Sequence, residues 1–121
     1  MPIPGFEEFM LPILSLLSAG KEVQKKEVKN FLIEKYNISE EEQKEMIKSG
    51  RTTVFLNRAS WALSYLKHAG LISSIKLGYY TITDSGKKVL LKKPTKIDRA
   101  FLLQFPDFIS FISPNKDNGK E

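Results

Sequence analysis

The segment between Thr53 and Gly70 constrains the fold of this chain more than any other part of the sequence. Its apolar residues recur at helical spacing and form one stripe made of Phe55, Ala59, Ala62, Leu63 and Leu66. Thr52 or Thr53 can cap the start of such a helix, and Gly70 can adopt the left-handed conformation that ends it. The pattern therefore predicts a well-defined helix with one face in a core and the other face exposed.

Three helices are predicted before this segment. The first ends near Gly20 and contains Pro12, which either kinks the helix or opens its regular part. The second covers residues 24–36, with apolar residues on one face and lysines on the other. The third covers residues 39–50, begins with the spacing of a capping box and ends at a glycine.

A hairpin is predicted after the central helix. Residues 71–75 and 79–82 have the pattern of two strands joined by a tight turn, and a short helix follows over residues 84–91. Helix, helix, short helix, longer helix and hairpin is the order of a winged helix-turn-helix. The expected fold class is therefore mainly α with a small β-hairpin, a winged helix-turn-helix with additional C-terminal helices.

The chain divides into three parts on this interpretation. Residues 1–96 form a winged-helix DNA-binding domain. Residues 97–112 form a C-terminal helical extension that packs on the core or on a partner subunit, because they carry too many large apolar residues for a solvated segment. Residues 113–121 are polar and are expected to be a disordered tail or a linker.

Positive charge is concentrated in one block of the chain. Residues 51–96 contain 9 Lys or Arg and a single acid, Asp84, which gives a net charge of +8, whereas residues 1–50 carry −2 and residues 97–121 carry −1. Such a block is the electrostatic footprint of a polyanion-binding site. A basic surface that only confers solubility fits the charge alone almost equally well.

The outer face of the central helix carries hydrogen-bond donors and no acids. At 100° per residue, the side chains that point away from the apolar stripe are Asn57, Ser60, Trp61, Ser64 and His68. Arg58 and Lys67 lie on the two flanks of this face, residues 51–53 lie at the helix entrance, and Lys76 lies in the hairpin. The predicted DNA-binding residues are Arg51, Thr52, Thr53, Asn57, Arg58, Ser60, Ser64, Lys67 and Lys76.

Three side chains on this helix have competing interpretations. Asn57 either bonds an adenine edge or caps the helix entrance. Trp61 is expected to pack under the N-terminal lead or the C-terminal helices rather than to stack on bases. His68, the single histidine, is expected to be a solvated residue near the helix C-terminus.

Four stretches of the sequence also carry a recognisable pattern: MLPIL at residues 10–14, TVFLNRASWA at 53–62, YLKHAGLI at 65–72 and YTITDSG at 80–86. Over about residues 5–92 the chain thereby resembles the N-terminal domain of Mrr-type restriction endonucleases. The resemblance implies a winged helix that binds DNA. It also implies that a separate nuclease domain of the PD-(D/E)xK kind, found in these methylation-dependent type IV enzymes, lies outside this chain.

The sequence argues against catalysis by the chain itself. It contains no cysteine, which excludes a disulfide scaffold, a thiolate zinc site and a cysteine nucleophile, and which is typical of a reducing cytoplasm. It also lacks a phosphate-cradling glycine motif and a carboxylate pair for magnesium. We therefore expect a cytoplasmic, non-enzymatic module with no catalytic residues, no metal and no cofactor.

The sequence therefore predicts duplex DNA binding by the recognition domain of a modification-dependent restriction endonuclease. The alternatives are a stand-alone winged-helix transcription regulator that dimerises through its C-terminal helices, and a winged helix used only for protein interaction. Duplex DNA, methylated or unmethylated, is the expected partner, and no membrane association is expected. The sequence leaves open whether the domain is a homodimer.

Overall fold

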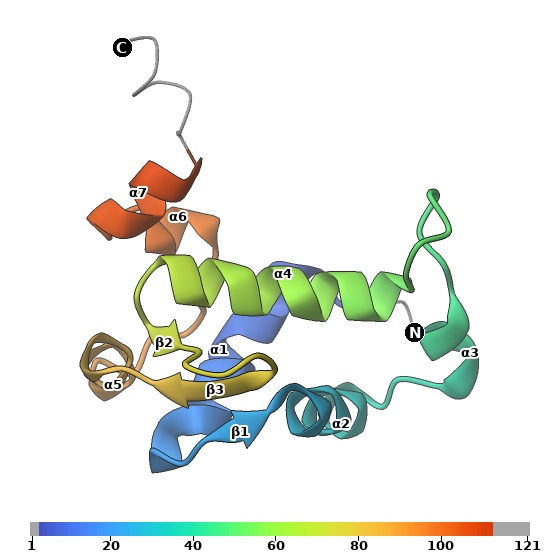
Figure 1. Ribbon diagram of the computed structural model, residues 1–121, viewed down its shortest axis with the longest axis horizontal. Helices are drawn as coiled ribbons and strands as arrows, with labels where there is room; N and C mark the ends of the chain where they lie inside the picture. The colour runs from blue at the N-terminus through green and yellow to red at the C-terminus, as the bar shows by residue number, and fades with distance from the viewer. Residues whose placement is uncertain (1–2, 113–121) are drawn as a thin grey trace, which may run out of the picture.

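The structure is a computed structural model that describes residues 3–112. Figure 1 shows a helical molecule with a small sheet at one side of its longest helix. In chain order, the elements are α1 (Phe6–Leu16), the 3-10 helix η1 (Leu17–Ala19), β1 (Val23–Gln24), α2 (Lys25–Tyr36), α3 (Glu40–Lys44), α4 (Val54–His68), β2 (Ile72–Ser73), β3 (Tyr79–Ile82), α5 (Asp84–Leu91), α6 (Arg99–Leu102) and α7 (Pro106–Ile112).

The helix α4 forms at the place that the sequence predicts. The hydroxyl of Thr53 caps it by accepting a hydrogen bond from the backbone N–H of Leu56 at 3.1 Å, and Gly70 follows it with a φ of +82°. All five residues of the predicted apolar stripe are buried. Helix α1 packs on α4, and its Phe9 ring meets Phe55 edge-on with ring centroids 5.9 Å apart. Helix α1 therefore holds α4 by one face.

The sheet has three antiparallel strands in the order β1-β3-β2. The β2–β3 pairing confirms the predicted hairpin. The first strand was missed by sequence analysis, because two residues are too short to show a period of two. It places Val23 opposite Tyr80 and Gln24 opposite Tyr79. Together with the helices, this sheet confirms the predicted fold class, a mainly helical winged helix with additional C-terminal helices.

The third predicted helix is shorter than expected. Only Glu40–Lys44 is helical, and the expected continuation to Gly50 is wrong. Residues 45–53 instead form a loop that folds back on itself: Met46 and Thr53 form an isolated β-bridge, and the Val54 N–H donates to the Glu45 carbonyl at 2.7 Å. Gly50, with a φ of +73°, turns the tip of this loop rather than ending a helix.

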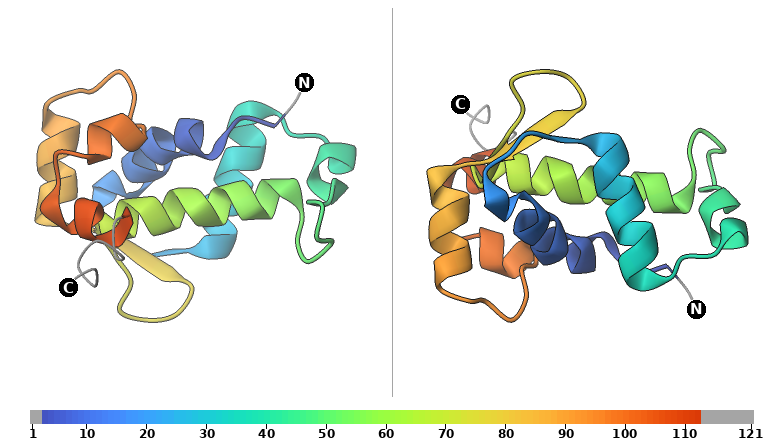
Figure 2. Two further views of the ribbon diagram at one scale, coloured as in Figure 1. Left: turned by 90° about the horizontal axis from the view of Figure 1, so that it is seen from above. Right: turned by 90° about the horizontal axis from the view of Figure 1, so that it is seen from below.

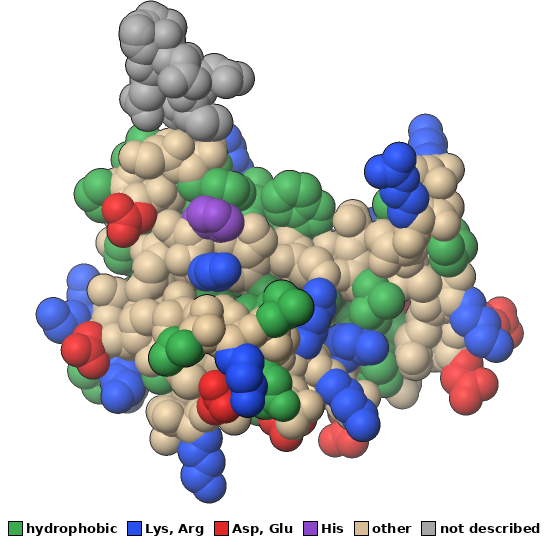
Figure 3. All heavy atoms as spheres, in the orientation of Figure 1, with side chains coloured by type: hydrophobic (Ala, Val, Ile, Leu, Met, Phe, Trp, Pro, Cys, Tyr) green, Lys and Arg blue, Asp and Glu red, His purple; other side chains and the backbone are tan. Residues whose placement is uncertain are grey.

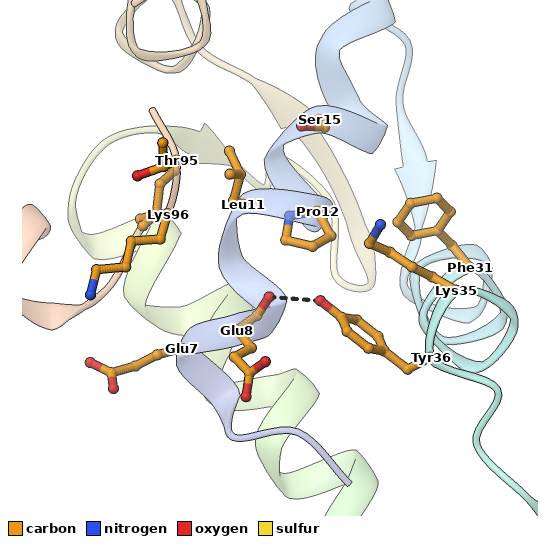
Figure 4. A pocket seen from close by; sticks show the side chains of 11 residues that line it. Glu7, Glu8, Leu11, Pro12, Ser15, Phe31, Lys35, Tyr36, Thr95 and Lys96 are labelled. Carbon is orange, nitrogen blue, oxygen red and sulfur yellow. Dashed lines mark hydrogen bonds between the residues drawn. The ribbon is translucent and has the colours of Figure 1, made fainter. Parts of the chain in front are cut away.

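Pro12 lies inside α1 without breaking it. Proline has no N–H, so the carbonyl of Glu8, four residues earlier, loses its helical donor. The hydroxyl of Tyr36 in α2 donates to that carbonyl instead, at 3.1 Å (Figure 4). The hydrogen bond ties α2 to α1 beside a hollow of about 580 Å³ between α1, α2 and residues 95–97. The pKa of Tyr36 is raised, mainly by burial.

The turn from the hairpin into α5 explains why the sequence has threonine and glycine three residues apart. The hydroxyl of Thr83 accepts a hydrogen bond from the Gly86 N–H at 3.1 Å and donates to the Gly70 carbonyl at 2.6 Å. A Cβ at Gly86 would press on the carbonyl oxygen of Leu71 and lie 2.7 Å from Cγ1 of Ile82. Only glycine therefore lets α5 approach the end of α4 and β3 this closely.

The two last helices pack on the rest of the chain. Ile97, Leu102 and Phe108 are almost completely buried, and α7 contacts α4. Both views of Figure 2 show α6 and α7 at the end of the molecule where α4 finishes. Residues 113–121, where the sequence predicts a tail or linker, lie outside the described residues.

Candidate nucleic-acid interface

Two loops project from the side of α4 that faces away from α1. One is the loop of residues 45–53 at the start of α4, and the other is the β2–β3 hairpin near its end. Figure 2 shows both in the view from above and in the view from below, with α1 on the opposite side of α4. Between them runs the outward face of α4, which the viewer of Figure 1 sees directly.

The part of this face nearest the sheet is a polar stripe. It consists of Thr53, Asn57, Ser60, Ser64 and Lys67, which lie within about 80° on the helical wheel. All five are at least partly exposed, and the sequence of α4 contains no acid. Because Thr53 caps the helix, Asn57 is not the cap, and its amide lies in the stripe one turn into the helix. Short uncharged side chains thus line the middle of the face, with a lysine at its end.

A hollow of about 150 Å³ opens beside the polar stripe. Its lining comes from α2, α4 and β3: Lys25, Ser60, Leu63, Ser64, Lys67, His68 and Tyr80. The ammonium of Lys25 donates to the Ser60 hydroxyl at 2.9 Å. Burial raises the pKa of Tyr80. Its phenolic O–H can donate a hydrogen bond into the hollow. Two ammonium groups and several hydroxyls at one hollow form a site suited to a phosphate.

Lys25 is the residue of this hollow that sequence analysis missed. It belongs to the first 50 residues, whose net charge is negative, so the count of charge along the chain gave it no weight. The short strand β1 brings it beside α4, and its backbone N–H donates to the Gly78 carbonyl at 2.8 Å. Figure 3 shows Lys and Arg side chains gathered where α2 approaches α4, with Asp and Glu toward the lower and outer edges of that view.

The entrance of α4 differs from the predicted anion site. The N–H groups of Val54 and Leu56 already donate to the Glu45 carbonyl and the Thr53 hydroxyl, and the Thr52 carbonyl accepts from the Ile47 N–H at 3.1 Å. Thr52 and Thr53 therefore help to close the 45–53 loop. Arg51 is exposed near the tip of that loop and is the charged group that this end of the interface presents.

The hairpin contributes one cation. The ammonium of Lys76 lies 4.1 Å from the centroid of the Tyr79 ring, a cation–π contact that holds it near β3. The predicted residues therefore lie along α4, on the 45–53 loop, which carries Arg51, and on the hairpin, which carries Lys76.

The remaining outward residues of α4 form a second stripe: Arg58, Trp61, Tyr65 and His68. We call it the covered stripe because the N-terminal segment and α7 contact it, although Trp61 and His68 remain exposed. One guanidinium nitrogen of Arg58, Nη1, donates to the carbonyls of Ile3 and Pro4 at 2.6 and 3.3 Å. The ring of His68 stacks on Phe111 of α7 with centroids 3.8 Å apart. These two side chains are thus in contact with the N-terminal segment and with α7.

The aromatic part of the covered stripe lies between these contacts. Tyr65 meets Phe6 and Phe108 edge-on, with ring centroids 4.8 and 5.2 Å away. Trp61, expected beneath the N-terminal lead or the C-terminal helices, instead keeps 46% of its surface exposed and touches Tyr65 edge-on.

Residues 3–112 contain neither a cluster suited to a metal ion nor a membrane-spanning helix. Within residues 3–112, no cluster of three or more His, Cys, Asp or Glu side chains is arranged to hold a metal ion. None of the helices in the same part of the chain is long and apolar enough to cross a membrane.

Comparison with known proteins identifies the chain. The model of the Mrr N-terminal domain family matches residues 6–92. This chain belongs to the Mrr N-terminal domain family. The match confirms the resemblance seen in the sequence and includes the whole polar stripe, the hollow and the hairpin.

This Mrr N-terminal domain is 30% identical over 87 residues to the type IV methyl-directed restriction enzyme EcoKMrr of Escherichia coli strain K12. The aligned region is 71% of this chain and 28% of that enzyme, so the chain spans a little over a quarter of its relative's length. No solved structure matches the chain. The family match ends at residue 92, before α6 and α7, and α7 lies over part of the covered stripe.

Proposed function

We propose that this Mrr N-terminal domain binds duplex DNA through the polar stripe of α4. In this proposal it is the non-catalytic recognition module of a modification-dependent restriction endonuclease whose nuclease domain lies outside this chain. The observation that carries the proposal is the polar stripe itself, an acid-free helix face beside a hollow that holds two lysines.

The dimensions of α4 suit a major groove. Fifteen residues extend over about 22 Å, and a groove about 12 Å wide admits one helix. With α4 in the groove, Asn57 and Ser64 can reach base edges, because both lie in the outward-facing polar stripe. Amide and hydroxyl side chains donate to and accept from base edges.

The cations would contact phosphates around that groove. Lys25 and Lys67 flank the hollow, and a backbone phosphate there would also meet the hydroxyls of Ser60 and Tyr80. Arg51 on the 45–53 loop and Lys76 on the hairpin would contact the backbone at the two ends of α4. Such contacts fix the position of the protein on DNA without reading the sequence.

Only some of the donors of Arg58 are free for DNA, because part of its guanidinium is already hydrogen-bonded within the chain. Nη1 donates to the carbonyls of Ile3 and Pro4, and a guanidinium has five N–H donors in all. A phosphate contact by its other donors stays a prediction, and so do the contacts proposed for Thr52 and Thr53.

A salt-dependent binding titration tests the proposal. Methylated and unmethylated duplexes of one sequence are titrated with the full 121-residue chain at several salt concentrations. We expect a log–log slope on the order of −3 to −6, because bound lysines and arginines release counterions from phosphates. The relative is described as methyl-directed, and we propose that the methylated duplex binds more tightly. A slope near zero with both duplexes would contradict DNA binding.

Three alanine variants locate the surface. Lys25→Ala and Lys67→Ala should each reduce the salt slope by about 1. Lys35→Ala makes the same change in charge beside the hollow between α1 and α2 (Figure 4), away from the polar stripe, and should leave the slope unchanged. An equal reduction of the salt slope in all three variants would mean that net charge alone drives binding.

Two further variants test base reading. Asn57→Ala and Ser64→Ala remove one short polar side chain each from the polar stripe. If either side chain bonds a base edge, its loss should change the preference among duplex sequences by about 1–3 kcal/mol. An equal loss of affinity for every sequence in the panel would instead indicate that the side chain contacts the DNA backbone.

A further inference from the structure

The tip of the hairpin exposes two large aliphatic side chains. Ile75 is 91% exposed and Leu77 is 97% exposed, the two highest values among the large hydrophobic residues that the structure describes. They flank Lys76 in the loop between β2 and β3. A cationic hairpin needs neither aliphatic group for its solubility or for a phosphate contact, so their position calls for a partner with an apolar surface.

Hydrogen bonds hold the turn that presents these side chains. The Ser74 hydroxyl donates to the Lys76 carbonyl at 3.0 Å, and the Tyr79 N–H donates to the same carbonyl at 3.0 Å. Gly78, with a φ of +83°, completes the turn, and its carbonyl accepts from the Lys25 N–H at 2.8 Å. The tip is therefore fixed relative to α2 and to the hollow beside α4.

The position of the tip indicates its partner. The hairpin projects on the same side of α4 as the polar stripe (Figure 2), so a duplex lying on that stripe also meets the hairpin. The Lys76 ammonium is held back over the Tyr79 ring. A phosphate offers no apolar surface to Ile75 and Leu77, but the faces of stacked bases do, and they are reached from the minor groove when a base step opens.

We propose that Ile75 and Leu77 form an apolar wedge that enters the minor groove next to the α4 site, partly unstacks one base step and bends the duplex. The proposal rests on the proposed function and adds to it a deformation of the DNA. The energetic gain is the burial of two aliphatic side chains against bases, and the opposing term is the loss of base stacking.

The wedge has a consequence for specificity. Pyrimidine–purine steps such as TA and CA unstack more easily than other steps, so a wedge favours them without any hydrogen bond to a base. The hairpin would thus select a deformable step at a fixed distance from the bases that face α4.

The experiment measures affinity and DNA bending together. A duplex of about 25 base pairs, carrying a TA step near its centre and a fluorophore at each end, is titrated with the 121-residue chain while energy transfer reports the end-to-end distance. The parent should shorten that distance. The double variant Ile75→Ser with Leu77→Ser should bind about tenfold to a hundredfold more weakly and leave the duplex straighter, with an unchanged salt slope because no cation is lost.

Two controls separate the wedge from other effects. Leu91→Ser removes an aliphatic side chain that is 80% exposed on α5, away from the hairpin, and should behave like the parent. Lys76→Ala should lower the salt slope by about 1 and leave the bend in place. Equal thermal unfolding of all variants shows that the fold is intact.

The outcomes distinguish the wedge from the proposed function. A parent that binds with the expected salt slope but leaves the duplex straight overturns the wedge alone. The wedge is also overturned if the double serine variant keeps the affinity and the bend of the parent, or if it only abolishes a dimer of this chain. A parent that binds no duplex overturns the proposed function and the wedge with it.

Discussion

The polar stripe and the covered stripe lie side by side on α4, yet their surroundings differ. The polar stripe faces the side from which the hairpin and the 45–53 loop project; Lys25 of α2 donates to its Ser60, and Met46 of the 45–53 loop forms a β-bridge with its Thr53. The covered stripe meets the N-terminal segment through Arg58 and α7 through Tyr65 and His68. One helix therefore has one stripe in contact with two other segments of its own chain, and another that, in the proposed complex, faces DNA.

This difference shows how α4 is held from two directions. Contact with α1 alone would leave the helix able to roll about its axis by small angles. The N-terminal carbonyls at Arg58 and the aromatic rings of α7 fix the roll from the other flank. The covered stripe thereby helps to set the direction in which Asn57 and Ser64 point.

The largest expected effect on stability comes from a carboxylate placed in the buried face of α4, compared with one placed in the polar stripe. Ala62 is completely buried against α1, so Ala62→Asp places an unpaired carboxylate in the core. We expect a loss of about 4 kcal/mol or more, enough to unfold most of a domain of ordinary stability. Thermal unfolding followed by circular dichroism measures it.

Ser64→Asp is the matched variant, because it adds the same carboxylate two residues later in the polar stripe. It should fold like the parent and lose DNA binding, since a carboxylate would face the phosphates. If the Ala62→Asp variant has the same unfolding midpoint as the parent, Ala62 does not lie in the buried face of α4.

The second largest effect on stability tests how α7 packs on Tyr65. Phe108 is completely buried and meets Tyr65 edge-on, so Phe108→Ala should lower the free energy of unfolding by about 3–5 kcal/mol. The neighbouring Ile109 is 45% exposed, and Ile109→Ala should change it by less than about 1 kcal/mol. Urea denaturation compares the two. Similar losses in both variants would mean that α7 does not pack on α4 through Phe108.

The smallest effect compares the two cationic flanks of α4. Arg58→Ala removes the hydrogen bonds to the Ile3 and Pro4 carbonyls and should destabilise the fold by about 1–2 kcal/mol. Lys67→Ala should leave the stability within about 0.5 kcal/mol of the parent, because Lys67 is an exposed side chain.

The salt slope sharpens this last comparison. Measured well below the unfolding midpoint, a slope for Arg58→Ala equal to that of the parent assigns Arg58 to structure alone. A slope reduced by about 1 assigns its remaining donors to a phosphate. If Lys67→Ala destabilises the fold as much as Arg58→Ala does, the division between the two flanks is wrong.

Several elements could be predicted from the sequence because their signals are local. The cap at Thr53, the apolar stripe of α4 and the glycine after it lie within one helix, and the structure has them as predicted. The bounds of α5, Asp84–Leu91, were also predicted, since Thr83 caps the helix from within its own turn. Caps and periodicity act over three or four residues, which a single sequence shows directly.

Other elements could not be predicted because their partners are distant in the chain. The strand β1 exists through its pairing with β3, and the 45–53 loop closes through a bridge that competes with helix formation in the same residues. A short segment of this kind has no strong preference of its own. Packing against the rest of the molecule decides its conformation.

The amino-acid sequence by itself determined that α4 has one buried and one outward face, because side chains 3.6 residues per turn apart share a face whatever surrounds the helix. The tertiary structure alone decided which outward residues are exposed. Lys25 reaches Ser60 across 35 residues, and Arg58 reaches the Ile3 carbonyl across 55. Contacts at such separations depend on how helices and strands pack, and no local pattern in the chain records them.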